Sequence, residues 1–126
     1  MSIFFNKVQG MMNQIERNDT RLISYQVNYN SFGHETMVYI NWERKFFIEF
    51  FHDARDDVDY SVSVAGYYTK TYNDLEDYKC LKFVSMTDLA RQQGWIQEGN
   101  YLTFDEEFEI LKSKYNLNFY KILREE

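Results

Sequence analysis

MVYINWERKFFIEFF, residues 37–51, is the stretch that decides the fold of this 126-residue chain. Ten of its fifteen residues are large and apolar, and most of the polar ones gather in the middle. The pattern predicts two strands, about 37–42 and 46–51, that reverse direction over the polar residues between them.

The second of these strands carries aromatic residues on both faces. Phe46, Ile48 and Phe50 share one face, while Phe47 and Phe51 lie on the other. A strand of this kind usually lies inside a sheet and is covered on at least one side. We therefore expect residues 37–51 to form the central hairpin of the domain.

Further strands are expected on both sides of this hairpin. Ile23–Tyr29 and Val58–Val64 each alternate apolar and polar residues, which is typical of half-buried strands. Asn30–Gly33 is a turn signal, and His52–Asp57 is predicted to be a polar loop. Tyr78–Met86 recovers apolar character and is a candidate fifth strand. Successive strands with short connections predict an antiparallel meander.

Two helices can be predicted from periodicity and end signals. Ser2 can cap a first amphipathic helix that runs to about Asn18. A short helix begins at Thr87, and Gly94 is well placed as its C-terminal cap.

A last helix opens at Thr103, which forms a capping-box pair with Glu106. Residues 117–123 follow two asparagines and could be either the end of this helix or an edge strand. The predicted fold is α+β: a four- or five-stranded antiparallel meander sheet packed by N-terminal and C-terminal helices. Residues 1–126 are expected to form a single domain.

Composition places the chain in a reducing compartment. Cys80 is the only cysteine, so an internal disulfide and a thiolate metal cluster are both excluded. Residues 1–17 lack the pattern of a signal peptide, and no window approaches the ~20 apolar residues of a membrane helix. We expect a cytoplasmic protein that does not bind membranes.

Motifs of catalysis and metal binding are not found. Asp53–Asp59 offers oxygen ligands, but an EF-hand loop that starts at Asp53 would have valine where glycine and glutamate are needed. His34, His52 and Cys80 do not form a recognisable catalytic set. The sequence therefore predicts a protein that is not an enzyme and needs no metal or other cofactor.

Direct nucleic-acid binding is not expected either. Leu89–Trp95 partly matches the turn of helix-turn-helix proteins, but the helix that follows begins with Asp105-Glu106-Glu107, which phosphates would repel.

The net charge of −6 is unevenly distributed. Asp53–Asp77 holds seven acids and two bases, and Glu98–Glu109 holds five acids and no base, so each segment has a net charge of −5. The remaining residues sum to +4. Such a chain is attracted to basic protein surfaces. The acids of the second segment have another explanation, because acids in the first turns of a helix stabilise its dipole.

Tyrosines interleave with the acids of the first segment. Tyrosine offers rigid amphipathic area and is enriched in interface hot spots, while neighbouring acids would complement Lys and Arg of a partner. The alternative is that these rings cover the sheet edge and the acids are solvated. The predicted partner-binding residues are Asp53, Asp56, Asp57, Asp59, Tyr67, Tyr68, Tyr72, Asp74, Glu76 and Asp77.

These features favour a small acidic binding protein that inhibits a basic partner by blocking its nucleic-acid-binding surface. Anti-defence proteins of phages and mobile elements, and immunity proteins of nucleases, are classes with this size and charge. The partner would be a basic protein such as a nucleic-acid-binding enzyme. The alternative is a small-ligand or assembly module that uses an aromatic pocket of the sheet. The sequence does not fix the oligomeric state.

A partner surface on Asp53–Asp77 can be tested by kinetics of complex formation. The double change Asp74→Lys and Asp77→Lys should slow association and flatten its salt dependence, because the acids steer encounter. Tyr72→Ala should speed dissociation, with a loss of about 2 kcal/mol if the ring is a hot spot. Normal binding by both variants would contradict this placement.

Overall fold

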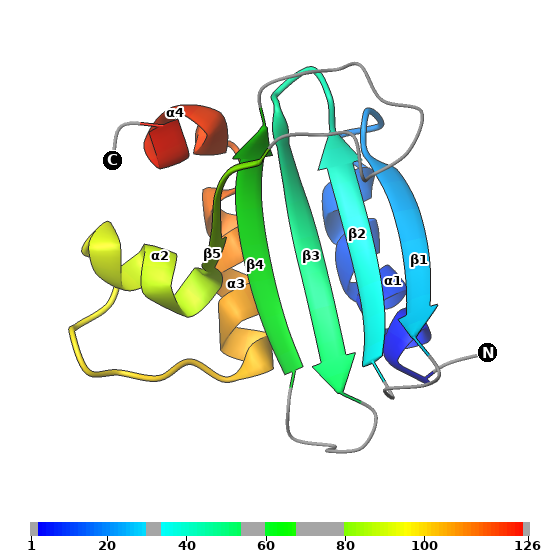
Figure 1. Cartoon of the computed structure of the whole chain (residues 1–126), viewed down its shortest axis with the longest axis horizontal. Helices are drawn as coiled ribbons and strands as arrows, with labels where there is room; N and C mark the ends of the chain where they lie inside the picture. Colours follow the sequence, from blue (N-terminus) through cyan, green and yellow to red (C-terminus); the bar gives the residue numbers. More distant parts are fainter. Residues whose placement is uncertain (1–2, 30–33, 54–59, 68–79, 125–126) are drawn as a thin grey trace.

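The protein folds around a five-stranded antiparallel sheet with the strand order β1-β2-β3-β4-β5 (Figure 1). The computed structural model describes residues 3–29, 34–53, 60–67 and 80–124. The strands are β1 (Ile23–Tyr29), β2 (His34–Asn41), β3 (Phe46–Asp53), β4 (Tyr60–Tyr67) and β5 (Cys80–Ser85). The predicted meander is confirmed, with the strand of residues 46–51 at its centre.

The helices are α1 (Ile3–Glu16), α2 (Met86–Gln92), α3 (Phe104–Lys114) and α4 (Phe119–Arg124). Figure 1 shows α1 and α3 on the same side of the sheet, with α1 behind β1 and β2 and α3 behind β4 and β5. The predicted α+β class is therefore confirmed. Among the described residues, none of these helices has the length and apolar character that crossing a membrane requires.

The main core fills the space between the sheet and the helices. Phe46, Ile48 and Phe50 of β3 have no exposed surface, as the alternation predicts. Phe46 makes edge-on contacts with Tyr115 and with Phe119 of α4, at ring-centroid distances of 5.7 and 5.4 Å. Val8 and Met12 of α1 belong to the same buried cluster, so helices from both ends of the chain pack on one face of β3.

The opposite face of the sheet, which we call the outer face, carries a smaller apolar cluster. Val38, Ile40 and Phe47 are buried there, with exposed fractions of 6, 1 and 2%. The register places the apolar residues of β1 on this face too, since Ile23 pairs with Ile40 and Tyr25 with Val38. Ile23 and Tyr25 are 44 and 40% exposed. The expectation that β1 buries its apolar side is wrong at these two positions, because β1 is an edge strand and its apolar side faces away from the helices.

Two further expectations change at element boundaries. His52 belongs to β3, because it pairs with Glu35 and Tyr60 on either side, so the predicted loop cannot begin there. Residues 119–124 form α4, so the edge strand considered for residues 117–123 is wrong. The predicted turn at residues 30–33 and the remainder of the loop at 54–57 lie outside the described residues.

Local end signals explain where the later helices begin and end. Thr103 accepts a hydrogen bond from the Glu106 amide at 3.2 Å, and the Glu106 carboxylate accepts one from the Thr103 amide at 3.0 Å. This confirms the predicted capping box. Gly94 has a φ of 75° directly after α2, a conformation that glycine adopts without strain.

The position of β3 can be tested by stability measurements. Ile48→Ala should lower the free energy of unfolding by about 2–5 kcal/mol, because it leaves a cavity at a fully buried site. Ile23→Ala is the matched control, since the same truncation at an exposed position should change stability by about 0.5 kcal/mol or less. Urea denaturation measures both. Equal effects of the two changes would show that the central strand is misplaced.

Candidate functional site

The predicted partner-binding residues fall mostly outside the part of the chain that the structure describes. Asp53 is the last residue of β3 and Tyr67 the last residue of β4. Because β3 and β4 run antiparallel, these two residues lie at opposite ends of the sheet (Figure 1). Asp56, Asp57, Asp59, Tyr68, Tyr72, Asp74, Glu76 and Asp77 lie outside the described residues, so this surface stays a prediction.

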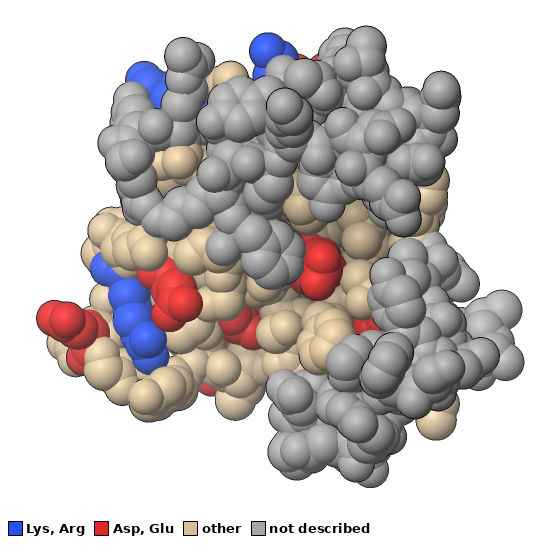
Figure 2. Space-filling view, in the orientation of Figure 1, with Lys and Arg blue, Asp and Glu red and all other residues tan. Residues whose placement is uncertain are grey.

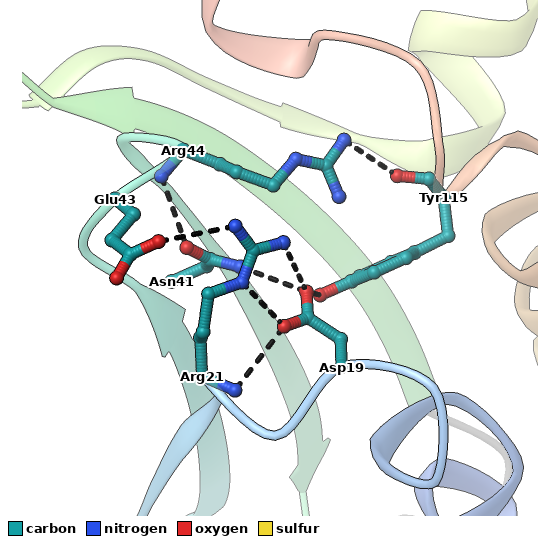
Figure 3. A network of polar contacts seen from close by, with 6 residues as sticks. All are labelled: Asp19, Arg21, Asn41, Glu43, Arg44 and Tyr115. Atoms are coloured by element: carbon teal, nitrogen blue, oxygen red, sulfur yellow. Dashed lines mark hydrogen bonds and ion pairs between the residues drawn. The ribbon is translucent and has the colours of Figure 1, made fainter.

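A buried carboxylate ties distant parts of the chain together at one end of the sheet (Figure 3). Asp19, in the link between α1 and β1, is only 6% exposed. Its Oδ2 accepts hydrogen bonds from the Tyr115 hydroxyl at 2.7 Å and from Asn41 Nδ2 at 2.9 Å. Its Oδ1 accepts from Arg21 Nε at 2.9 Å and from the Arg21 amide at 3.2 Å.

The surroundings of Asp19 favour its charged form. Burial by itself raises the pKa of the carboxyl, but the hydrogen bonds from Arg21 and Tyr115 and the charge of Arg21 outweigh it and lower the pKa to about 2. Burial and the bond to Asp19 raise the pKa of the Tyr115 hydroxyl, which therefore stays protonated as a donor. Every strong contact of Asp19 is internal, so this cluster stabilises the fold.

A cavity of about 490 Å³ lies beside this cluster. Its lining residues are Glu43, Arg44, Lys45, Asn116, Asn118 and Tyr120. Arg44 is already engaged, because its guanidinium donates to the carbonyls of Tyr115 and Leu117 just after α3. The Arg44 guanidinium also lies 5.0 Å from the ring centroids of Phe46 and Tyr115. Arg44 therefore satisfies backbone carbonyls at the C-terminal end of α3, and this part of the cavity lining has a structural role.

A histidine–carboxylate pair lies at the other end of the sheet. His52 Nδ1 is 3.3 Å from Glu35 Oε1, and the His52 ring stacks on Tyr60 at a centroid distance of 4.2 Å. Such a pair resembles a general base with its orienting acid. However, His52 is only 6% exposed, and its Nε2 is buried without a hydrogen-bond partner in the described structure. Among the described residues, Phe4 of α1 and Tyr60 of β4 pack against the His52 ring.

Glu107 of α3 connects this helix to β4 and to α2. It is 4% exposed, and its carboxylate accepts hydrogen bonds from the Val62 amide at 3.3 Å and from the Thr87 amide and hydroxyl at 3.1 and 3.0 Å. Burial raises the pKa of this carboxyl, and the bonds from Thr87 and Val62 only partly oppose that rise. Glu107 thus satisfies a strand amide of β4 and an amide in the first turn of α2.

The other acids of residues 98–109 remain at the surface. Glu98, Asp105, Glu106 and Glu109 are all exposed. Asp105 forms an ion pair with Lys7 at 3.5 Å and Glu109 with Lys112 at 3.2 Å, and both carboxylates are well solvated. Exposed pairs of this kind contribute little to stability. The explanation by the helix dipole holds for three acids of this segment, because Asp105, Glu106 and Glu107 lie in the first turn of α3 and Lys112 and Lys114 in its last turn. Glu106 also caps the helix, and Glu107 is buried. Glu98 and Glu109 lie outside the first turn.

Three of these surface acids, Asp105, Glu106 and Glu109, border an apolar groove of about 410 Å³. The groove runs between α3 and the segment that precedes it, and its exposed surface is mostly apolar. Its lining residues are Ile96, Leu102, Asp105, Glu106, Glu109 and Ile110. The sequence predicted the acids but not the groove, because Ile96 and Leu102 follow no helical or strand periodicity.

Charge on the outer face of the sheet is mixed. Figure 2 shows acidic atoms at several places among the described residues of this face, with basic atoms along the edge near α2 and at the upper rim. Glu49 lies on this face of β3, where burial raises the pKa of its carboxyl. Within the part of the chain that is described, no group of three His, Cys, Asp or Glu side chains could hold a metal ion.

Comparison with protein-family models, curated proteins and solved structures found no match to this chain.

The Asp19 cluster predicts a specific pH dependence of stability. A carboxyl whose pKa falls from 3.8 to about 2 on folding contributes about 2 kcal/mol above pH ~5, and this contribution is lost as the pH falls towards 2. Asp19→Asn should lower stability by about 2–4 kcal/mol at neutral pH, and its deficit should shrink by about 2 kcal/mol in acid.

Urea denaturation across this pH range measures the difference between wild type and variant. The exposed Asp105→Asn variant is the control and should show no comparable deficit. A deficit of Asp19→Asn that is independent of pH would contradict the assigned ionisation.

Proposed function

We propose that this protein is an acidic binding protein that inhibits a basic partner by occupying its nucleic-acid-binding surface. The observation that supports the proposal is the division of charge. Two segments each carry a net charge of −5, while the rest of the chain sums to +4.

The exposure of the acids in residues 98–109 supports the proposal. Of the five acids in residues 98–109, only Glu107 is buried, and the other four keep their exposure. A partner with clustered Lys and Arg would be attracted to such a surface over a distance of about 10 Å at moderate salt. Nucleic-acid-binding surfaces carry such clusters, since they neutralise phosphates.

Binding by complementary charge also explains inhibition. An acidic protein and a nucleic acid that use the same basic surface cannot be bound at the same time. The proposal therefore requires direct competition between the protein and nucleic acid for the partner, and it requires no catalytic step.

The experiment is affinity capture from cell lysate followed by competition. The immobilised protein should retain a basic protein at low ionic strength and lose most of it at high ionic strength, because binding depends on screened charges. Added duplex DNA should displace the captured protein, whereas an uncharged polysaccharide at equal mass should not. Mass spectrometry identifies what is retained.

Two outcomes would contradict the proposal. The first is retention that does not depend on salt, which is the behaviour of an apolar ligand pocket. The second is a stable ternary complex of this protein, its partner and nucleic acid.

A further inference from the structure

The groove beside α3 combines an apolar floor with an acidic rim. Ile96, Leu102 and Ile110 are only partly buried, so the floor is open to solvent. The rim carboxylates of Asp105 and Glu109 are 76 and 64% exposed. A volume of about 410 Å³ is within the range of ordinary ligand sites, roughly 300–1,000 Å³.

Helical spacing aligns the rim with the floor. Asp105 and Glu109 are four residues apart, as are Glu106 and Ile110, so these two rows are neighbours on the surface of α3. The row of Asp105 and Glu109 is acidic, whereas the row of Glu106 and Ile110 joins an acid to the apolar floor of the groove. A partner that places apolar side chains in the groove would therefore bring its flanking residues against carboxylates.

The opposite wall of the groove is held in place by contacts with α2. Arg91 donates from Nε to the Asn100 carbonyl at 3.1 Å, and its guanidinium lies 4.9 Å from the centroid of the Tyr101 ring. The Trp95 amide donates to the Ala90 carbonyl at 2.8 Å. Because these bonds fix the segment between α2 and α3 at both ends, the groove is formed before a partner arrives.

We propose that this groove binds a basic amphipathic helix of a partner protein. Aliphatic residues at i, i+3 or i+4 of that helix would enter between Leu102 and Ile110, and Lys or Arg on its flanks would pair with Asp105 and Glu109. The argument for this occupant is charge complementarity. Asp105 and Glu109 pair with Lys7 and Lys112 through solvated contacts that contribute little, so Lys or Arg of a partner can take the place of these lysines. An acidic helix is repelled by the same carboxylates. The inference rests on the proposed function, because it names the part of a basic partner that this surface takes.

The test uses a synthetic helical peptide with leucines on one face and lysines on the other. A peptide of the same composition but scrambled order, which has no apolar face, is the control ligand. Fluorescence anisotropy measures affinity, and methyl chemical shifts of the isoleucine and leucine residues report the place of binding. The ordered peptide should bind at least about tenfold more tightly than the scrambled one.

Two pairs of variants locate the site. Leu102→Ser should weaken peptide binding about tenfold, whereas Leu117→Ser, at a site that is 40% exposed away from the groove, should not. The double change Asp105→Asn and Glu109→Gln should weaken binding several-fold and flatten its salt dependence. Glu16→Gln with Glu43→Gln removes the same charge elsewhere and should leave binding unchanged.

The inference is supported if the shifts gather at Ile96, Leu102 and Ile110 and the variants behave as stated. It is overturned if the shifts lie elsewhere, if Leu102→Ser binds as wild type does, or if the scrambled peptide binds equally well. It is also overturned if analytical ultracentrifugation shows a dimer that Leu102→Ser dissociates, since the occupant would then be a second copy of the chain.

The two proposals can fail separately. If DNA still displaces the captured partner but the peptide does not use the groove, the proposed function stands and its surface lies elsewhere. If the peptide binds in the groove but DNA does not compete with this protein for the partner, the groove is a binding site and the proposed inhibitory function is wrong.

Discussion

The fold depends on covering the inner face of β3. Phe46, Ile48 and Phe50 have no exposed surface. A helix about 10 Å wide cannot by itself cover the inner face of a five-stranded sheet, whose strands lie about 4.8 Å apart. The chain solves this with α1 from its N-terminal end and α3 and α4 from its C-terminal end. The N-terminal and C-terminal helices must therefore be held together on the same face of the sheet. Buried hydrogen bonds such as that between Asp19 and Tyr115 make this connection.

Two buried carboxylates, Asp19 and Glu107, make these connections by different means. Asp19 has a guanidinium beside it, so its charge is compensated and its pKa is lowered. Among the described residues, the donors to Glu107 are neutral amides and a hydroxyl; burial prevails over these bonds, so the pKa of Glu107 is raised. Asp19 joins the link after α1 to the end of α3, whereas Glu107 joins α3 to β4 and to the start of α2. Helix α3 is thus fastened near both of its ends.

The sequence predicted what depends on neighbours along the chain. Strand alternation gave the order of the sheet and the buried face of β3, and Thr103 with Glu106 gave the start of α3. It could not predict the Asp19–Tyr115 bond, since the partners are 96 residues apart and Asp19 reads as an ordinary helix-terminating residue. It also missed the groove, because a groove depends on how the segment of residues 95–103 returns to α3.

The orientation of β1 shows a related limit of periodicity. The alternation of apolar and polar residues shows that Ile23 and Tyr25 lie on the same face of the sheet. It does not show whether that face is the inner or the outer one. Only the register with β2 shows that they lie on the outer face beside Val38 and Ile40. The helices cover the inner face, which is occupied there by Met37 and Tyr39 of β2.

The acidic residues differ in how much they contribute to the stability of the fold. Asp19 and Glu107 are buried, and Glu106 completes a helix cap, so their contacts within the chain explain them. The ion pairs that Asp105 and Glu109 make with described residues are solvated and add little to stability, because solvent screens them and ordering two long side chains costs entropy. Asp105 also lies in the first turn of α3, where the helix dipole favours an acid by a modest amount. Both carboxylates nevertheless stand along an apolar groove whose open wall is fixed by Arg91. A partner that covered this groove would gain the free energy of removing its apolar surface from water. Carboxylates that contribute little to stability and apolar surface that the fold leaves open thus occur at the same place, which is the physical reason for proposing a partner there.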